Sequence, residues 1–130
     1  MILIDTSVWI DFFHGHSQLN HVIKLKQLLN NNQEITLCGV IFMEILQGIR
    51  DEKQYHLTKD YLECLPCLEI TQSIYGEAAQ IYRELRARGI TIRKSADCVI
   101  AAVTLKHQCY LLHHDRDFEM IAKHFSLKLL

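Results

Sequence analysis

Short apolar runs alternate along the chain with longer stretches in which apolar positions recur at helical spacing. This alternation is typical of an α/β fold, in which parallel strands are connected by helices. The predicted strands cover residues 2–4, 35–38, 68–70 and 110–112. The predicted helices cover residues 7–13, 19–29, 40–49, 52–65, 74–88, 96–107 and 118–124. The last strand lacks polar alternation, which indicates a central place in the sheet.

The helix predicted over residues 96–107 is apolar on almost every side, so we expect it to be packed on both sides. Gly89 is expected to end the preceding helix, because glycine favours the backbone conformation found just past helix ends. Pro66 is the only proline, and no glycine-rich linker or internal repeat divides the chain. At 130 residues, the sequence predicts a single domain over residues 1–130.

The net charge is −1, so no overall basic field predicts binding to nucleic acid or to an anionic membrane. Asp5 follows only four residues, so no secretory leader is expected before it. No apolar stretch approaches the about 20 residues of a membrane helix. These features predict a soluble cytoplasmic protein. The five cysteines do not form an even set, and no disulfide framework is expected.

Four carboxylates occupy positions that a parallel sheet would bring together. Asp5 directly follows the first strand, and Asp115 comes shortly after the last. Asp97 begins the apolar helix, and Glu44 lies in the helix that follows the second strand. Because the carboxyl ends of parallel strands meet at one edge, side chains from distant segments converge there. The sequence therefore predicts an acidic site at this edge.

Each acid also has a structural interpretation. Asp5 is a suitable N-cap for the helix after it, and Glu44 suits a solvent-facing strip. Asp97 suits the first turn of its helix, which Ser95 is placed to cap. Asp117 is expected to cap the last helix, which leaves Asp115 as the better ligand. Only the joint placement of the acids favours a metal site, since hard ions such as Mg²⁺ or Mn²⁺ prefer carboxylate oxygens. Phosphodiester hydrolysis is chemistry that such ions support.

Four segments together resemble the successive motifs of PIN-domain proteins, and most closely those of VapC-type toxins. They are residues 2–11 (ILIDTSVWID), 44–48 (EILQG), 89–102 (GITIRKSADCVIAA) and 111–118 (LLHHDRDF). The resemblance extends over the whole chain with the motifs in family order. It implies a three-layer α/β/α sandwich around a parallel sheet. It also implies a Mg²⁺-dependent endoribonuclease, for which Mn²⁺ is a possible substitute, that forms a homodimer and is held inactive by a VapB-type antitoxin docking near the acids.

The resemblance also assigns site residues. The acids expected to carry catalysis and bind the metal are Asp5, Glu44, Asp97 and Asp115, and Asp117 is a secondary metal ligand. Ser7 and Thr6 are expected to support the site from the turn after the first strand. The chain departs from the family at His113, where relatives commonly have threonine or serine. We expect His113 to be a hydrogen-bonded residue without a catalytic role.

RNA contacts must come from local basic residues, because the whole chain is nearly neutral. Arg93, Lys94 and Arg116 are the candidates, since they lie next to the acids in sequence and guanidinium groups bind phosphate well. Six further residues have large aromatic or apolar side chains, which suit either the core or a surface that binds a partner. They are Trp9, Phe12, Phe13, Ile41, Phe42 and Leu46.

Parts of the sequence are compatible with three other functions. A phosphoacceptor receiver domain needs adjacent acids after the first strand, whereas Thr6 and Ser7 follow Asp5. A redox or zinc module is suggested by the C-x-x-C spacing of Cys64 and Cys67, but this pair ends a predicted helix and has no second ligand pair. A PIN fold that binds RNA or protein with little catalysis is disfavoured by the four intact acids.

Overall fold

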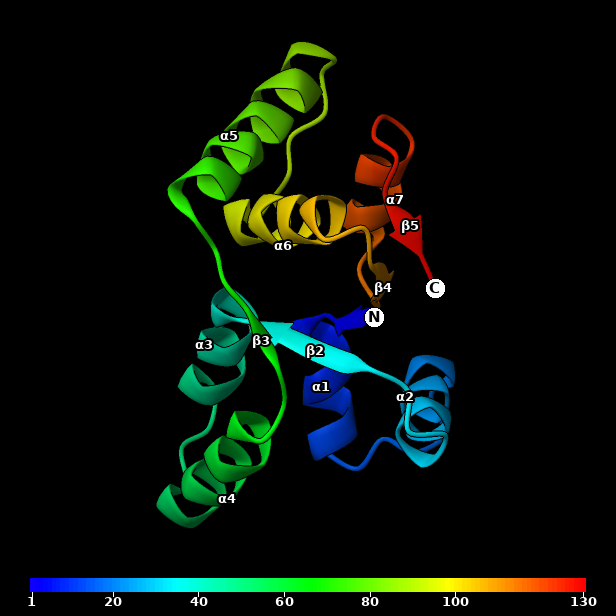
Figure 1. Ribbon diagram of the computed structural model, residues 1–130, viewed down its shortest axis with the longest axis vertical. Coiled ribbons are helices and arrows are strands. Elements are labelled where there is room, and N and C mark those ends of the chain that lie inside the picture. Colours follow the sequence, from blue (N-terminus) through cyan, green and yellow to red (C-terminus); the bar gives the residue numbers. More distant parts are fainter.

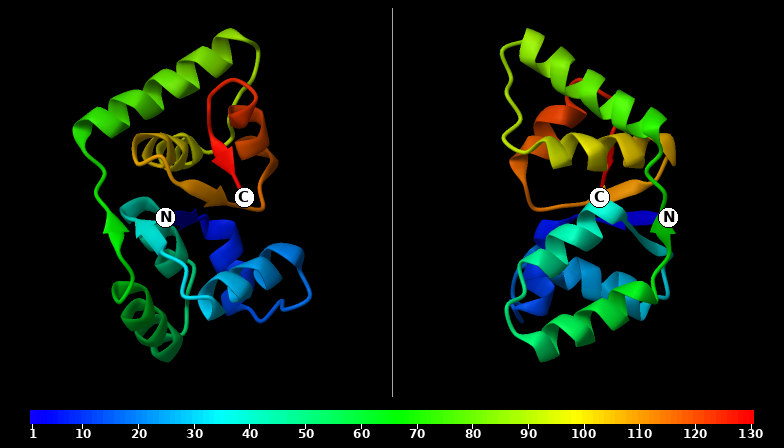
Figure 2. Two further views of the ribbon diagram at one scale, coloured as in Figure 1. Left: turned by 45° about the vertical axis from the view of Figure 1, so that its right-hand side comes forward. Right: turned by 90° about the vertical axis from the view of Figure 1, so that its left-hand side faces the viewer.

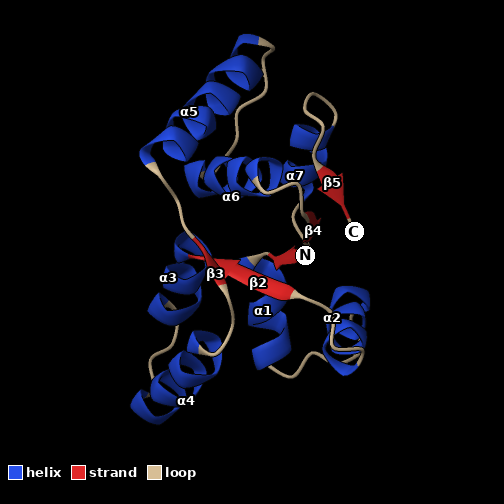
Figure 3. Cartoon of the chain, viewed as in Figure 1, coloured by secondary structure: helices blue, strands red, loops and turns tan.

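The computed structural model describes residues 1–130 and contains one parallel five-stranded sheet in the order β3-β2-β1-β4-β5. The strands are β1 (Ile2–Ile4), β2 (Ile35–Cys38), β3 (Cys67–Leu68), β4 (Tyr110–Leu112) and β5 (Lys128–Leu129). The helices are α1 (Thr6–Phe13), α2 (Asn20–Asn30), α3 (Gly39–Gln47), α4 (Glu52–Glu63), α5 (Gln72–Ala87), α6 (Ser95–Lys106) and α7 (Arg116–Ala122). Figure 1 labels these elements, and Figure 3 separates helices from strands by colour.

The helices lie in two layers, with α1 to α4 on one face of the sheet and α5 to α7 on the other (Figure 2). The α/β/α sandwich predicted from the sequence is therefore confirmed. A core of 29 buried residues runs through the layers. Burial follows the sequence pattern closely in α6, where seven of the residues are buried. No helix is both long and apolar enough to cross a membrane.

The middle of the sheet is β1, which pairs with β2 on one side and β4 on the other. Leu3 lies beside Leu111 and Ile4 beside Leu112, and these side chains are almost completely buried. The last apolar strand, predicted to be central, is indeed not an edge strand, although β1 is the middle one. β4 is an interior strand between β1 and β5, and the apolar runs of β1 and β4 are too alike to show which lies in the middle.

The edges of the sheet differ from the prediction. The strand expected over residues 68–70 is instead Cys67–Leu68, and β5 was not predicted. Both edge strands contain only two residues, too few to show alternation of apolar and polar positions. Their pairing with β2 and β4 is thus a consequence of tertiary structure.

Local signals fix several helix ends. The Asp5 side chain accepts a hydrogen bond from the Ser7 backbone N–H and caps α1 as predicted. Gly89 follows the end of α5 with a φ of 80°, the left-handed conformation expected there. The predicted Ser95 cap was wrong, because α6 begins at Ser95 and Lys94 holds the cap position without a side-chain bond.

The aromatic set is divided between the core and its margin. Trp9, Ile41 and Leu46 are buried, which confirms the core interpretation for them. Phe12, Phe13 and Phe42 are partly buried and pack against the core. Trp9 stacks on Phe13, which lies one turn later in the same helix α1, at a centroid distance of 5.7 Å.

Candidate metal centre

Neighbouring strands place the first and last acids at the same edge of the sheet. Asp5 follows β1 and its backbone N–H donates to the Leu112 carbonyl of β4 at 2.9 Å. Asp115 follows β4 by a short turn. Because α6 precedes β4 and runs back across the sheet, its first turn returns Asp97 to this edge.

Three carboxylates form the centre of the site. Asp97, Asp115 and Asp117 each offer one oxygen, and these oxygens lie within 4.8 Å of one another. The Asp115 Oδ1 atom also accepts the Asp117 backbone N–H at 3.0 Å and caps α7. The prediction that Asp117 is the cap was therefore wrong. The helix begins at Arg116, two residues before the predicted start, which places Asp117 in its first turn facing the cluster.

Asp97 is the most perturbed acid of the cluster. It is 2% exposed, and its Oδ2 atom has no hydrogen-bond partner. Burial raises the pKa of Asp97 to about 7, and the charge of Lys94 opposes this rise while the negative charges of Asp5, Asp115 and Glu44 add to it. A buried, unpartnered carboxylate oxygen is costly unless a cation compensates it. The residues present therefore fit a bound cation.

Asp5 is held rigidly beside the cluster. Its Oδ2 atom accepts hydrogen bonds from the Ser7 Oγ at 2.5 Å and from the Ser7 backbone N–H at 3.2 Å. Burial raises the pKa of Asp5, although the bonds from Ser7 act in the opposite direction. The Ser7 Oγ also accepts the backbone N–H of His114 at 3.1 Å, so this hydroxyl joins the turn after β1 to the turn after β4.

Glu44 reaches the same region from α3. It is half-buried, and Thr6 donates its hydroxyl to Glu44 Oε1 at 2.8 Å. Asp5 and Glu44 lie outside the group of three oxygens, but the charges of both raise the pKa of Asp97. Both hydroxyl residues after β1 thus donate a hydrogen bond to an acid.

Arg93 provides positive charge at the exposed side of the cluster. Its guanidinium group lies 3.3 Å from Asp115 Oδ1 and 3.4 Å from Asp117 Oδ2, while its side chain is 63% exposed. Lys94 acts on Asp5 and Asp97 through its charge. Arg116 lines a hollow together with Arg93 and Asp115. All three predicted basic residues therefore lie near the acids.

Comparisons with known proteins agree with this geometry. Residues 2–124 match the family model of the PIN domain. The ribonuclease VapC11 of Mycobacterium tuberculosis is 36% identical over 98% of this chain and 96% of its own length. This chain belongs to the PIN-domain family, in its VapC branch. The ribonuclease VapC1 of Methanocaldococcus jannaschii is 30% identical over 98% of this chain and 85% of its own length.

Solved structures support the same fold for this PIN domain. The crystal structure of VapBC2 from Rickettsia felis, bound to a DNA fragment from their promoter, contains a chain that matches with a TM-score of 0.78. The match covers 100% of the PIN domain and 98% of that chain at 19% sequence identity. At this identity, the likeness concerns the fold alone.

His113, the departure from the family motif, has a hydrogen-bonding role in this PIN domain. Its Nδ1 atom accepts the Asp115 backbone N–H at 3.1 Å, and its Nε2 atom lies 3.3 Å from Glu119 Oε1. The ring packs against Phe118 at a centroid distance of 5.4 Å. The imidazole therefore holds the turn that carries Asp115, a task for which a short hydroxyl side chain is also suited.

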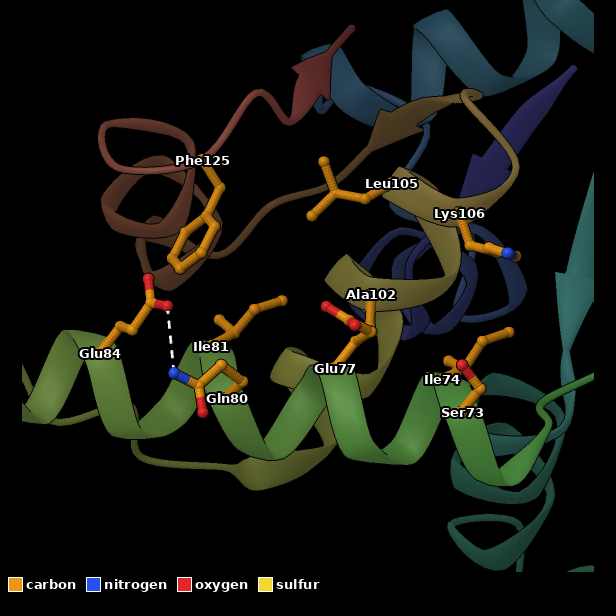
Figure 4. Close-up of a pocket in the computed structure, with 10 residues that line it drawn as sticks. All are labelled: Ser73, Ile74, Glu77, Gln80, Ile81, Glu84, Ala102, Leu105, Lys106 and Phe125. Atoms are coloured by element: carbon orange, nitrogen blue, oxygen red, sulfur yellow. Dashed lines mark hydrogen bonds between the residues drawn. The ribbon is translucent and has the colours of Figure 1, made fainter.

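The exposed cysteine pair and a second hollow lie apart from the acids. Cys64 ends α4 and Cys67 begins β3, and neither forms a disulfide. A hollow of about 290 Å³ lies between α5 and α6 (Figure 4). It opens on the second half of α6, at Ala102 and Lys106, whereas Asp97 lies in the first turn. This hollow is therefore separate from the acid cluster.

The fold brings together Asp11, His21 and His114 beside the site, three residues that have no common signal in the sequence. His21 Nε2 lies 2.6 Å from Asp11 Oδ2, and the His21 ring stacks on the His114 ring. Asp11 is on α1, His21 is on α2, and His114 is in the turn after β4. No periodicity connects residues on three such segments, so only the folded chain shows the cluster.

Proposed function

We propose that this chain is a metal-dependent endoribonuclease, the toxin of a VapBC-type toxin–antitoxin pair, built from a single PIN domain over residues 1–130. The observation that carries the proposal is the buried Asp97 oxygen without a partner, next to the oxygens of Asp115 and Asp117. Its support from sequence is the 36% identity with a protein named as a VapC ribonuclease over almost the full length of both chains.

Asp97, Asp115 and Asp117 are the residues proposed to hold the ion, and Asp5 and Glu44 complete the acidic surroundings. All of these donors are carboxylate oxygens, a set that favours Mg²⁺, or Mn²⁺ as a substitute, over softer ions. When bound, such an ion supplies activation of water and compensation of charge on a phosphate under attack.

The chain's own residues have distinct roles in this proposal. Ser7 and Thr6 fix the positions of Asp5 and Glu44 through the hydrogen bonds described above. Arg93 is held by two carboxylates but remains exposed, so it is placed to bind a phosphate that flanks the cleaved bond. Lys94 and Arg116 are proposed to add further phosphate contacts from the same side.

The proposed partners are an RNA substrate, a VapB-type antitoxin and a second copy of the chain in a homodimer. The support is indirect, because solved proteins of the same fold include VapBC assemblies of Rickettsia felis and of nontypeable Haemophilus influenzae. An antitoxin that occupied the acidic edge would prevent RNA from reaching it. Purification for the activity test must therefore remove any bound partner.

The test is cleavage of a total RNA pool by the partner-free protein, with Mg²⁺, with Mn²⁺ and with EDTA. The Asp97→Asn variant is assayed in parallel with Mg²⁺. The matched control is Asp60→Asn, which makes the same change at an exposed position on α4. We expect discrete fragments from the wild type and from the control with Mg²⁺ or Mn²⁺, none with EDTA, and none from Asp97→Asn.

Fragment ends then identify the RNA and the cleaved sequence. Intact RNA in every lane, from wild-type protein with a cooperative unfolding transition, would contradict the nuclease proposal and favour a PIN fold that only binds. Equal cleavage by wild type and Asp97→Asn would show that the acid cluster is not the source of activity.

A further inference from the structure

His114 presents an exposed imidazole ring beside the acid cluster. It lines a hollow of about 590 Å³ whose other walls include Arg93, His113, Asp115 and Arg116. This hollow is therefore continuous with the acids through Asp115 and carries two guanidinium groups. None of the hydrogen bonds that order the acids involves the His114 ring, since His114 contributes only its backbone N–H to Ser7.

The His114 ring is supported from behind. The His21 ring lies parallel to it, with a centroid distance of 4.0 Å and an interplanar angle of 14°. His21 is 8% exposed, so it covers one face of the His114 ring and is itself shielded from solvent. His114 as a whole is exposed, which leaves the ring accessible on the side away from His21.

Asp11 fixes the orientation of the supporting ring. Its Oδ2 atom lies 2.6 Å from His21 Nε2, and its Oδ1 atom lies 3.3 Å from His16 Nδ1. The hydrogen bond with His21 lowers the pKa of Asp11, so this carboxylate is charged at neutral pH and fixes His21 through the short contact with Nε2. The plane of the His21 ring, and of the ring stacked on it, is thereby set before any ligand binds.

A flat ring of fixed orientation, next to cationic groups, matches the chemistry of single-stranded RNA. Unpaired bases stack on aromatic side chains, including histidine, while arginine side chains bind the flanking phosphates. A ring that is already ordered loses little entropy when a base stacks on it. We infer that His114, supported by His21 and Asp11, is a stacking platform for one nucleobase next to the phosphodiester bond at the acid cluster.

This inference rests on the proposed function, because it deepens the account of how RNA is held at the same site. His114 contacts the base directly, whereas His21 and Asp11 are positioning residues that act through it. The platform is tolerant of base identity, since every base has a flat face. It fixes where the RNA lies, and contacts elsewhere select the sequence.

The direct test is an NMR titration of the intact protein with adenosine 5′-monophosphate and, separately, with uridine 5′-monophosphate, both in EDTA. We expect the ring-proton resonances of His114 to move upfield, as they do when a base lies over a ring. They should move further for the purine, which has the larger π-surface. The resonances of His56, which is exposed on α4, should stay in place. His114 resonances that do not move with either nucleotide would overturn the inference.

Variants separate stacking from a structural role. The affinity of an eight-nucleotide single-stranded RNA is measured for protein carrying Asp97→Asn, so that the RNA stays intact. Adding His114→Ala should weaken binding about tenfold, or about 1.4 kcal/mol, within the range for loss of one base–aromatic stack. Adding His114→Phe should restore it, and adding His21→Ala in place of His114→Ala should also weaken binding, because the ring of His114 then loses its support. His56→Ala is the control and should bind as before.

Equal affinity of the His114→Ala and His114→Phe proteins would overturn the platform. Failure of the platform can be distinguished from failure of the proposed function. If the wild type cleaves RNA but the nucleotides leave His114 unmoved, the platform is wrong and the nuclease stands. If the wild type leaves RNA intact while the His114 resonances move as expected, base stacking stands and the cleavage is wrong.

Discussion

Replacing Asp97 with asparagine should stabilise the metal-free protein, although it removes a residue at the centre of the site. The side chain is 2% exposed, and one of its oxygens has no partner. Burial raises the pKa of Asp97 from 3.8 to about 7 in the folded protein. At neutral pH and above, folding must therefore bury a charge that the unfolded chain keeps in water.

The sign of the pH effect follows from proton binding. Between pH 3.8 and about 7, the folded state retains a proton on Asp97 that the unfolded state has released. The contribution of Asp97 to stability is thus fully present below the lower value and is lost as pH rises through the upper one. Asparagine carries no charge at any pH, so the stability of the variant does not fall over this pH range.

The magnitude can be worked from the shift. A rise of about three pKa units corresponds to about 4 kcal/mol of unfolding free energy. Water reaches the cluster on the side of Arg93, whose side chain is 63% exposed, and screens part of this cost. We therefore expect Asp97→Asn to raise the unfolding free energy by about 2 kcal/mol at about pH 8 and by only about 0.7 kcal/mol at about pH 5, where little more than a third of the range between the two pKa values has been crossed.

The assay is equilibrium unfolding in urea, in the presence of EDTA, at both pH values. The expected gain moves the midpoint at the higher pH by about 1 M urea with the slope unchanged. Asp60→Asn, at an exposed position, should not move it. With Mg²⁺ in place of EDTA, the wild type should gain stability from the ion and the variant should gain less. The reasoning is refuted if wild type and Asp97→Asn unfold at the same urea concentration at both pH values in EDTA.

Three other perturbations test separate parts of the description. Thr6→Val removes the 2.8 Å hydrogen bond to Glu44 and should weaken Mn²⁺ binding about tenfold, as measured by calorimetry. Thr6→Ser keeps the hydroxyl and should bind Mn²⁺ as the wild type does. Equal Mn²⁺ affinities of the two variants would argue against this positioning role. Gly76→Ala, in open space within α5, should stabilise the protein by about 0.5–1 kcal/mol, whereas Gly89→Ala, at a φ of 80°, should destabilise it by about 1 kcal/mol. Thermal unfolding in which both variants shift the midpoint in the same direction would contradict this account of the backbone. Arg93→Ala should lower RNA affinity and reduce the slope of log affinity against log salt by about 0.7, and an unchanged slope would remove Arg93 from the phosphate contacts.

The interior of the fold was predictable because strands and helices that are buried on several sides leave long apolar signals. The bounds of β1, β2 and β4 agree with the prediction, and the burial of α6 follows directly from its sequence. The two edge strands left no such signal, since β3 and β5 contain two residues each and form by pairing with strands already in place.

The candidate site was predictable to a different degree. The order of strands and helices is enough to gather Asp5, Asp97 and Asp115 at one edge of a parallel sheet. Spacing alone does not decide which acid of an Asp-x-Asp turn caps the helix, because the choice depends on the residue at which α7 begins. The His21 and His114 stack was beyond prediction, since it depends on how α2 packs against a turn far along the chain.

The order of the strands in the sheet also determines when, during synthesis, the acid cluster can form. β1 is made first, yet it is the middle strand and stays unpaired on one side until β4 leaves the ribosome, since Ile2 pairs with Tyr110. Asp115 and Asp117 are translated later still. If this chain is the nuclease proposed above, its nascent form lacks part of the acid cluster until Asp115 and Asp117 have left the ribosome. A partner translated nearby would then have that interval in which to meet an inactive chain.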